Sequence, residues 1–234
     1  MAIIQAPSYN ERLLIVGANG SGKTKLAELF LASGYPRTVT IDLKGEINPP
    51  FPDGEPVWRV RKPIGWQWRQ SIRKGHLIYQ PPPEYRTMET MDAVFHHLYA
   101  RARKYGKKYP FILYLDEGLS LAHMGGSKWL SALVVEGRSL KCGVWISSQR
   151  PLWIPVEIRT EAWRWYIFYL AYRDDIDEII KYSGGRLSRE DLTEALADYS
   201  FWEMRRHLGG KLSVRHYPPI DLIHPWHDDK MPHN

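Results

Sequence analysis

A glycine-rich loop near the N-terminus has the clearest potential for chemistry: GANGSGKT, at residues 17–24. It matches the pattern GxxxxGK[ST], in which glycines let backbone N–H groups face a row of phosphates. An apolar stretch precedes the loop and a helical pattern begins within it, which is the context that the motif requires. The alternative, a glycine-rich turn that only starts a helix, does not explain the Lys and Thr at the end of the motif.

The loop therefore predicts an ATP site that uses Mg²⁺. Lys23 is expected to reach the β and γ phosphates, and the hydroxyl of Thr24 to ligate Mg²⁺, a hard cation that prefers oxygen. The predicted nucleotide-binding residues are Gly17, Asn19, Gly20, Ser21, Gly22, Lys23 and Thr24.

Two adjacent carboxylates follow an apolar run later in the chain, FILYLDE at residues 111–117. This is the pattern of a Walker B strand. Asp116 is expected to hold the Mg²⁺-bound water, and Glu117 to take a proton from the water that attacks the γ phosphate. A surface acidic pair at a strand end is common in isolation, but the complete phosphate loop upstream favours the catalytic interpretation. Asp42 and Glu46 follow a shorter, less apolar strand, and we expect them to cap the chain or face a neighbouring subunit.

Gln149 follows another apolar run, GVWISS at residues 143–148. If this run is a strand beside the acidic one, the amide of Gln149 lies where it can sense the γ phosphate and orient water. A glutamine at a strand end also occurs without such a role, so the residue alone leaves both readings open.

Strand-like and helical segments alternate along the chain, which predicts an α/β fold with a mostly parallel sheet and helices on both faces. Further strands are expected at residues 12–17, 38–42, 57–62, 76–80 and 165–172, and helices at 23–34, 87–105, 128–140, 175–182 and 188–198. A C-terminal hairpin should turn at Gly209 and Gly210. We expect one domain over residues 1–217 and a loosely held Pro- and His-rich tail over 218–234.

Composition sets broader limits. The 234 residues carry a formal net charge of +6, which fits a polyanion partner without requiring one. No apolar run approaches the roughly 18 to 20 residues that span a bilayer, so we expect a soluble intracellular protein. The 10 tryptophans are expected mainly in the core or in interfaces, and Cys142 in the core.

The chain resembles the FtsK/HerA superfamily of DNA-pumping ATPases from about residue 12 to residue 185. The resemblance rests on the phosphate loop, LDE, the stretch from EGR to GVWISSQRP at residues 136–151, and IPVEIRTEA at 154–162. A minimal motor domain of this size is similar to the genome-packaging ATPases of membrane-containing icosahedral viruses, a group that includes poxvirus-type enzymes.

The resemblance implies a RecA-like domain in a ring, expected to be a hexamer, with ATP at subunit boundaries and double-stranded DNA through the centre. By position, Gln149 matches the family's sensor glutamine, and Arg138 matches an arginine that acts on the neighbouring subunit's nucleotide. Arg150, Arg159 and Arg173 are alternatives for that arginine. Capsid or vertex proteins would be partners, in the host cytoplasm or on the virion.

DNA contacts would fall mainly on phosphates, because a packaging motor must move any sequence. The residues expected to supply them are Arg59, Arg61, Lys62, Arg69, Arg73, Lys74, Lys107 and Lys108. Any one of these has an equally plausible role as part of a solvated basic face.

Three other functions share the phosphate loop. A filamentous-phage extrusion ATPase would be expected to carry a transmembrane segment. A small-molecule kinase needs an acceptor site and a mobile arginine-bearing lid, whereas a Walker B strand followed directly by Glu117 favours water as acceptor. A module that binds ATP only structurally would not need Lys23, Thr24, Asp116 and Glu117 together.

Overall fold

A central mixed sheet organises the molecule. The computed structural model describes residues 2–226, except 67, 69, 71, 72, 74, 118–126, 194, 195, 197 and 208. Within this part, nine strands form one sheet in the order β10-β9-β8-β2-β7-β6-β3-β5-β4. Their bounds are β2 Arg12–Val16, β3 Thr38–Ile41, β4 Val57–Val60, β5 His76–Tyr79, β6 Phe111–Leu115, β7 Cys142–Ser148, β8 Arg164–Ile167, β9 Phe201–Arg206 and β10 Leu212–Tyr217.

The strands from β8 to β4 are parallel, and β9 and β10 add an antiparallel hairpin at one edge. Every residue of β2 and of β6 is buried. Continuous apolar strands of this kind are typical of parallel sheets covered on both faces. The predicted RecA-like α/β fold is confirmed, and so is the C-terminal hairpin.

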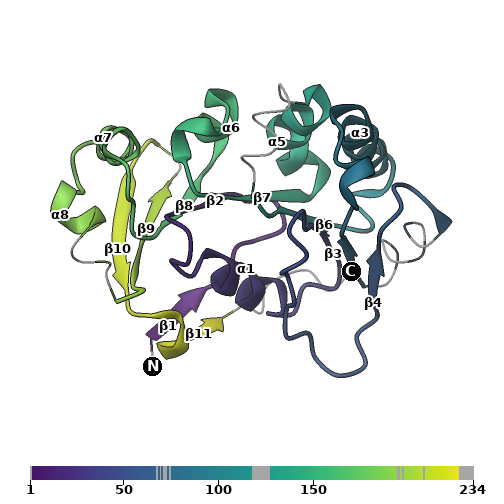
Figure 1. Ribbon diagram of the computed structural model, residues 1–234, viewed down its shortest axis with the longest axis horizontal. Helices are drawn as coiled ribbons and strands as arrows, with labels where there is room; N and C mark the ends of the chain where they lie inside the picture. The colour runs from purple at the N-terminus through teal and green to yellow at the C-terminus, as the bar shows by residue number, and fades with distance from the viewer. Residues whose placement is uncertain are drawn as a thin grey trace.

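The two faces of the sheet are covered unequally (Figure 1). Among the residues that the structure describes, four helices lie on one face: α3 Met88–Tyr105, α5 Lys128–Leu140, α6 Val156–Glu161 and α7 Arg173–Tyr182. On the other face lie α1 Lys23–Leu31 and a parallel strand pair, β1 Ala2–Gln5 with β11 Ile223–Trp226. Each covering layer has its own hydrophobic cluster. No helix in the described residues is long and apolar enough to cross a membrane.

The C-terminal segment differs from its prediction. Instead of a loose tail from Pro218, a 3-10 helix covers Ile220–Leu222 and β11 pairs with β1. Ile223 is buried with Phe201 and Tyr217 in the cluster beneath α1. This apolar anchor and the strand pairing outweigh the Pro, His and Asp content that suggested disorder. Residues 227–234 lie outside the described part.

Two other predicted elements end earlier than expected in the described residues. Of the helix expected over 188–198, the structure describes α8, Arg189–Leu192, which starts with a capping box between Ser188 and Asp191, while residues 194, 195 and 197 lie outside the described part. The strand expected over 165–172 is β8, which ends at Ile167. Beyond it the N–H of Phe168 still donates to the carbonyl of Val16, but the N–H of Leu170 donates to the carbonyl of Leu192. Tertiary hydrogen bonds therefore override the local apolar pattern.

A buried arginine, Arg164, links the hairpin to the N-terminal segment. Its guanidinium lies 3.4 Å from Glu11 and 3.2 Å from Glu203, and donates to the carbonyl of Gln5 and the hydroxyl of Tyr166. Burial alone would lower the pKa of Arg164, but Tyr166, Glu11 and Glu203 together raise it above its ordinary value. The arginine is charged, and it neutralises two carboxylates that the fold has largely removed from water.

Arg164→Met is expected to destabilise the protein by about 3 kcal/mol, because it leaves Glu11 and Glu203 without their shared cation. Urea unfolding measures the change. Arg215→Met, on exposed β10, is the matched control and should stay within about 0.5 kcal/mol of the parent. Equal stability of the Arg164→Met protein and the parent would show that the buried pairs contribute nothing to folding.

Candidate nucleotide-binding site

The phosphate loop connects the end of β2 to the start of α1. A Cβ on Gly17 would lie 2.6 Å from the Cβ of Phe168, so no other residue fits there. Gly22 precedes α1 with φ of 105°, in the left-handed region that favours glycine. The first N–H groups of α1 have no acceptor within the helix, and its positive end faces the loop. The local backbone is therefore arranged to receive an anion.

Lys23 lies across this loop. Its ammonium donates to the carbonyl of Ala18 at 2.8 Å. Burial lowers the pKa of Lys23 to about 8, although the carboxylates of Glu117 and Asp116 act in the opposite direction. A partly desolvated ammonium at a loop of N–H groups gains from a phosphate partner, as the predicted role requires.

Asp116 follows β6 directly and is 6% exposed. Its Oδ1 accepts hydrogen bonds from the hydroxyls of Ser147 at 2.8 Å and Tyr114 at 3.1 Å. Burial raises the pKa of Asp116, these two hydrogen bonds oppose the shift, and the nearby carboxylates of Asp42 and Glu117 add to it. Such a carboxylate gains from a cation.

The donor set fits Mg²⁺. Thr24 and Asp116 line the same cavity and both offer the hard oxygen ligands that this ion prefers. When bound, the ion would supply charge neutralisation for the phosphates and for the buried carboxylate.

Glu117 has a constrained backbone and a fixed side chain. Its φ is 59°, in the left-handed region that a residue with a side chain seldom adopts. Its N–H donates to Ser147 Oγ at 3.1 Å, and its Oε1 accepts from the amide of Gln149 at 2.7 Å. Its Oε2 forms an ion pair with Lys44. The structure thus places Gln149 beside the acidic strand end, as predicted, and in direct contact with the predicted base.

Asp42 holds the turn that carries Lys44. It is fully buried, and its carboxylate accepts from the N–H groups of Gly45, Glu46 and Ile47 and from the side chain of Gln80. The prediction that Asp42 caps the chain is confirmed. Its consequence for the site is that Lys44 faces Glu117.

A cavity of about 500 Å³ is lined by Lys23, Thr24, Asp116 and Glu117. Sequence reasoning did not identify Lys44, Tyr199, Pro219, Ile220 or Asp221 as site residues, yet all of them line it. The sequence marks Lys44 only weakly, because the residue lies just after a predicted strand of the same sheet. The other four come from the C-terminal region, and no local pattern connects them to a loop two hundred residues earlier.

Tyr199 offers the cavity a large ring. Its side chain is 61% exposed, and its φ of 68° is again in the left-handed region. Pro219 and Ile220 contribute apolar surface to the same cavity. An exposed aromatic ring and apolar neighbours near a phosphate loop are suited to contact a nucleotide base.

Arg138 lies away from this chain's own phosphate loop. It is exposed near the end of α5, with its guanidinium 4.9 Å from the ring centre of Trp163, and it lines a separate cavity of about 240 Å³. That cavity includes Arg12 at the start of β2, whereas the phosphate loop follows the last residue of β2. The cavity and the loop therefore lie at opposite ends of this strand. Arg138 therefore cannot act on the nucleotide of its own subunit.

The alternative arginines are paired within the chain. Arg150 forms an ion pair with buried Asp175, and Arg159 pairs with Glu178. Arg173 is the most exposed of the three and lies 3.7 Å from Asp177. These contacts give Arg150 and Arg159 structural roles. Among the predicted DNA contacts, Arg69 and Lys74 lie outside the described residues.

Comparison with solved structures places the fold among P-loop ATPases. The genome-packaging NTPase B204 from Sulfolobus turreted icosahedral virus 2, solved with AMPPCP, matches with a TM-score of 0.66 and 16% identity, over 90% of this chain and 98% of that chain. B204 from Sulfolobus turreted icosahedral virus, described as a DNA-packaging ATPase, matches with a TM-score of 0.61 and 15% identity, over 89% and 98% of the two chains.

The cytoplasmic domain of the type VII secretion ATPase EccC from Thermomonospora curvata shares the fold more distantly. It matches with a TM-score of 0.55 and 13% identity, over 91% of this chain and 26% of that chain. The sequence matches no protein-family model and no curated protein. At these identities, the structural matches establish the fold.

Lys23→Ala is expected to abolish nucleotide binding, because it removes the only predicted lysine contact to the β and γ phosphates. Glu117→Gln should keep binding and lower the hydrolysis rate on the order of 100-fold or more, because an amide cannot accept the proton from water. Calorimetric titration with ATP and a phosphate-release assay separate the two effects. Full activity of Glu117→Gln would exclude it as the general base.

Tyr199→Ala is expected to weaken ATP binding roughly tenfold through lost contact with the base, while binding of tripolyphosphate, which has no base, stays the same. Tyr199→Phe should retain ATP affinity, and Tyr172→Ala, at another exposed tyrosine, should not alter it. Equal weakening for ATP and tripolyphosphate would instead point to a disturbed phosphate loop.

Proposed function

We propose that this chain is an ATPase that uses hydrolysis to translocate double-stranded DNA during the packaging of a viral genome. The observation that carries the proposal is the pairing of Glu117 with Gln149 at 2.7 Å beside the phosphate loop. Glu117 lines one cavity with Lys23 and Asp116, and the amide of Gln149 donates to the Glu117 carboxylate. The shared fold with B204, over nearly its whole length, supports the packaging role.

Hydrolysis follows from the arrangement of these side chains. Lys23 and the loop N–H groups bind the β and γ phosphates of ATP, and Thr24 and Asp116 would hold Mg²⁺. The carboxylate of Glu117 takes a proton from the attacking water. Its contacts with Gln149 and Lys44 fix its orientation. The amide of Gln149 contacts this carboxylate directly, so it can link the state of the γ phosphate to the position of the base.

A ring arrangement would complete the site. Arg138 is exposed at the amino ends of the strands, whereas its own phosphate loop lies at their carboxyl ends. It could therefore reach the nucleotide of a neighbouring subunit but not its own. There it would offset charge that develops on the γ phosphate. We infer a homo-oligomeric ring, a hexamer by analogy with the superfamily, that encloses the DNA and docks on capsid or vertex proteins in the host cytoplasm or on the virion.

Duplex DNA is expected to stimulate phosphate release several-fold, and the stimulation should weaken steeply between about 50 and 200 mM salt as counterions compete for the phosphate contacts. The assay uses protein shown to be assembled by light scattering, with Glu117→Gln as the inactive control. Equal rates with and without DNA would contradict translocation. They would favour extrusion of another cargo, or phosphate transfer to a small acceptor.

A further inference from the structure

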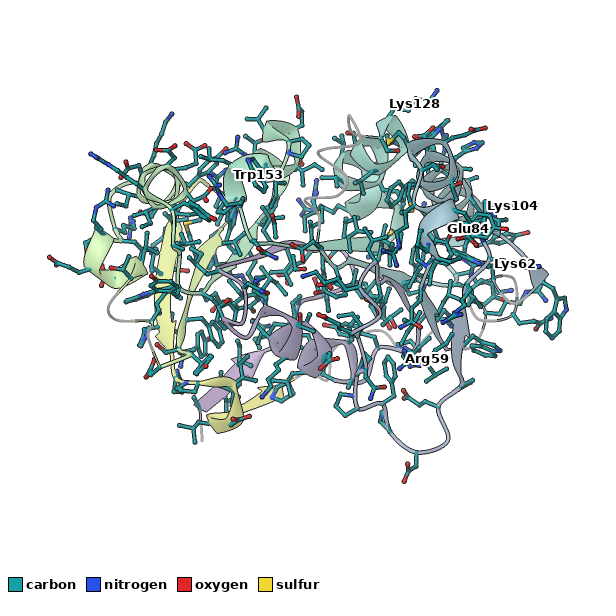
Figure 2. The ribbon with its side chains drawn as sticks, viewed as in Figure 1. Arg59, Lys62, Glu84, Lys104, Lys128 and Trp153 are labelled. Carbon is teal, nitrogen blue, oxygen red and sulfur yellow. The ribbon has the colours of Figure 1, made fainter. Side chains whose placement is uncertain are left out.

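A second cavity, of about 490 Å³, lies where α3 ends. Its volume falls in the range of ligand sites, roughly 300–1,000 Å³. The lining residues that the structure describes are Arg73, His97, Ala100, Arg101, Lys104, Tyr105, Lys108 and Tyr109. Figure 2 places Lys104 at the end of the molecule that carries α3 and β4, away from α7.

This cavity is separate from the nucleotide site. Arg73 and Tyr109 precede the first residues of β5 and β6, whereas the phosphate loop and Asp116 follow the last residues of β2 and β6. Because these strands are parallel, this cavity lies at their amino ends and the nucleotide cavity at their carboxyl ends. The five residues of β6 alone separate them by roughly 15 Å.

The charges that line the cavity all have one sign. Arg73, Arg101, Lys104 and Lys108 are cations, and none of the described lining residues is acidic. Burial, followed by the neighbouring Arg37 and Arg73, lowers the pKa of Arg101 to about 10. Gathering these cations in a concave, partly buried place costs free energy, which an anionic ligand would offset.

Aromatic rings and backbone carbonyl groups are the contacts of Lys104, Lys108 and the neighbouring Arg37. Lys104 and Lys108 lie 5.2 and 5.3 Å from the ring centres of Tyr105 and Tyr109. Arg37 lies 5.3 Å from the ring of Tyr109 and donates to the carbonyls of Arg73 and Pro110. Such contacts with rings and carbonyls leave the positive charge of these three side chains in place.

We propose that this cavity is a binding site for phosphate groups, distinct from the ATP site. Guanidinium and ammonium groups are the usual protein ligands of phosphate, and the planar fork of arginine matches its geometry. The phosphates can belong to a nucleic-acid backbone or to a free polyphosphate. The first source deepens the proposed function, since Arg73 and Lys108 belong to the group predicted to contact DNA, and the second is independent of it.

The test compares Lys104→Gln/Lys108→Gln with a matched control, Lys181→Gln/Lys211→Gln, which removes two exposed lysines elsewhere. Fluorescence anisotropy with a labelled duplex measures binding across salt concentrations. The cavity variant should bind roughly tenfold more weakly, and its slope of log affinity against log salt should fall by about 1.8, at about 0.9 per lost phosphate contact. The control should match the parent on both counts.

Calorimetric titration with tripolyphosphate tests the other source, in Lys23→Ala protein with and without the two cavity substitutions, so that the ATP site contributes little. Loss of tripolyphosphate binding with unchanged duplex binding would assign the cavity to a free polyphosphate. Unchanged binding of both ligands, or an equal loss in the control, would overturn the site. These assays need no hydrolysis, so they remain informative if the packaging function fails its own test.

Discussion

The hydrogen bond between Ser147 and the buried carboxylate of Asp116 determines how the rest of the site is arranged. It joins the ends of β6 and β7, whose register pairs Leu115 with Ile146 and so brings Asp116 opposite Ser147. The same hydroxyl accepts the N–H of Glu117, which fixes the left-handed turn at that residue. One serine thus orients both carboxylates. Gln149 follows the last residue of β7 and contacts Glu117.

The carboxyl ends and the amino ends of the parallel strands form two chemically different sides of the molecule. At the carboxyl ends of its strands, Asp116, Glu117, Lys23 and Lys44 line the nucleotide cavity, so charges of both signs meet there. At the amino ends, Arg138 and the cations around α3 are exposed, and the cavity beneath α3 has no described acidic lining residue. In the ring that we propose, the carboxyl ends of the strands would serve the chain's own nucleotide and the amino ends a neighbouring subunit or a polyanion.

The sequence was most informative where a motif and its structural context coincide. The phosphate loop and the acidic strand could be located because an apolar run, a glycine pattern and a helix start impose the same local geometry, and their side-by-side placement follows from the fold class. Lys44 was missed because its role depends on Asp42 accepting three N–H groups of a turn, which no local pattern encodes. Tyr199 and Ile220 were missed because the pairing of β9 with β8 and of β11 with β1 brings distant chain segments to the loop.

Use of water as the phosphate acceptor separates an ATPase from a kinase built on the same loop. Incubation of the assembled protein with ATP in ¹⁸O-labelled water, followed by mass spectrometry of the products, tests it directly. If water is the acceptor, the product is inorganic phosphate that carries one ¹⁸O from the solvent. Release of ADP without labelled phosphate, with the phosphoryl group found on another acceptor, would contradict it.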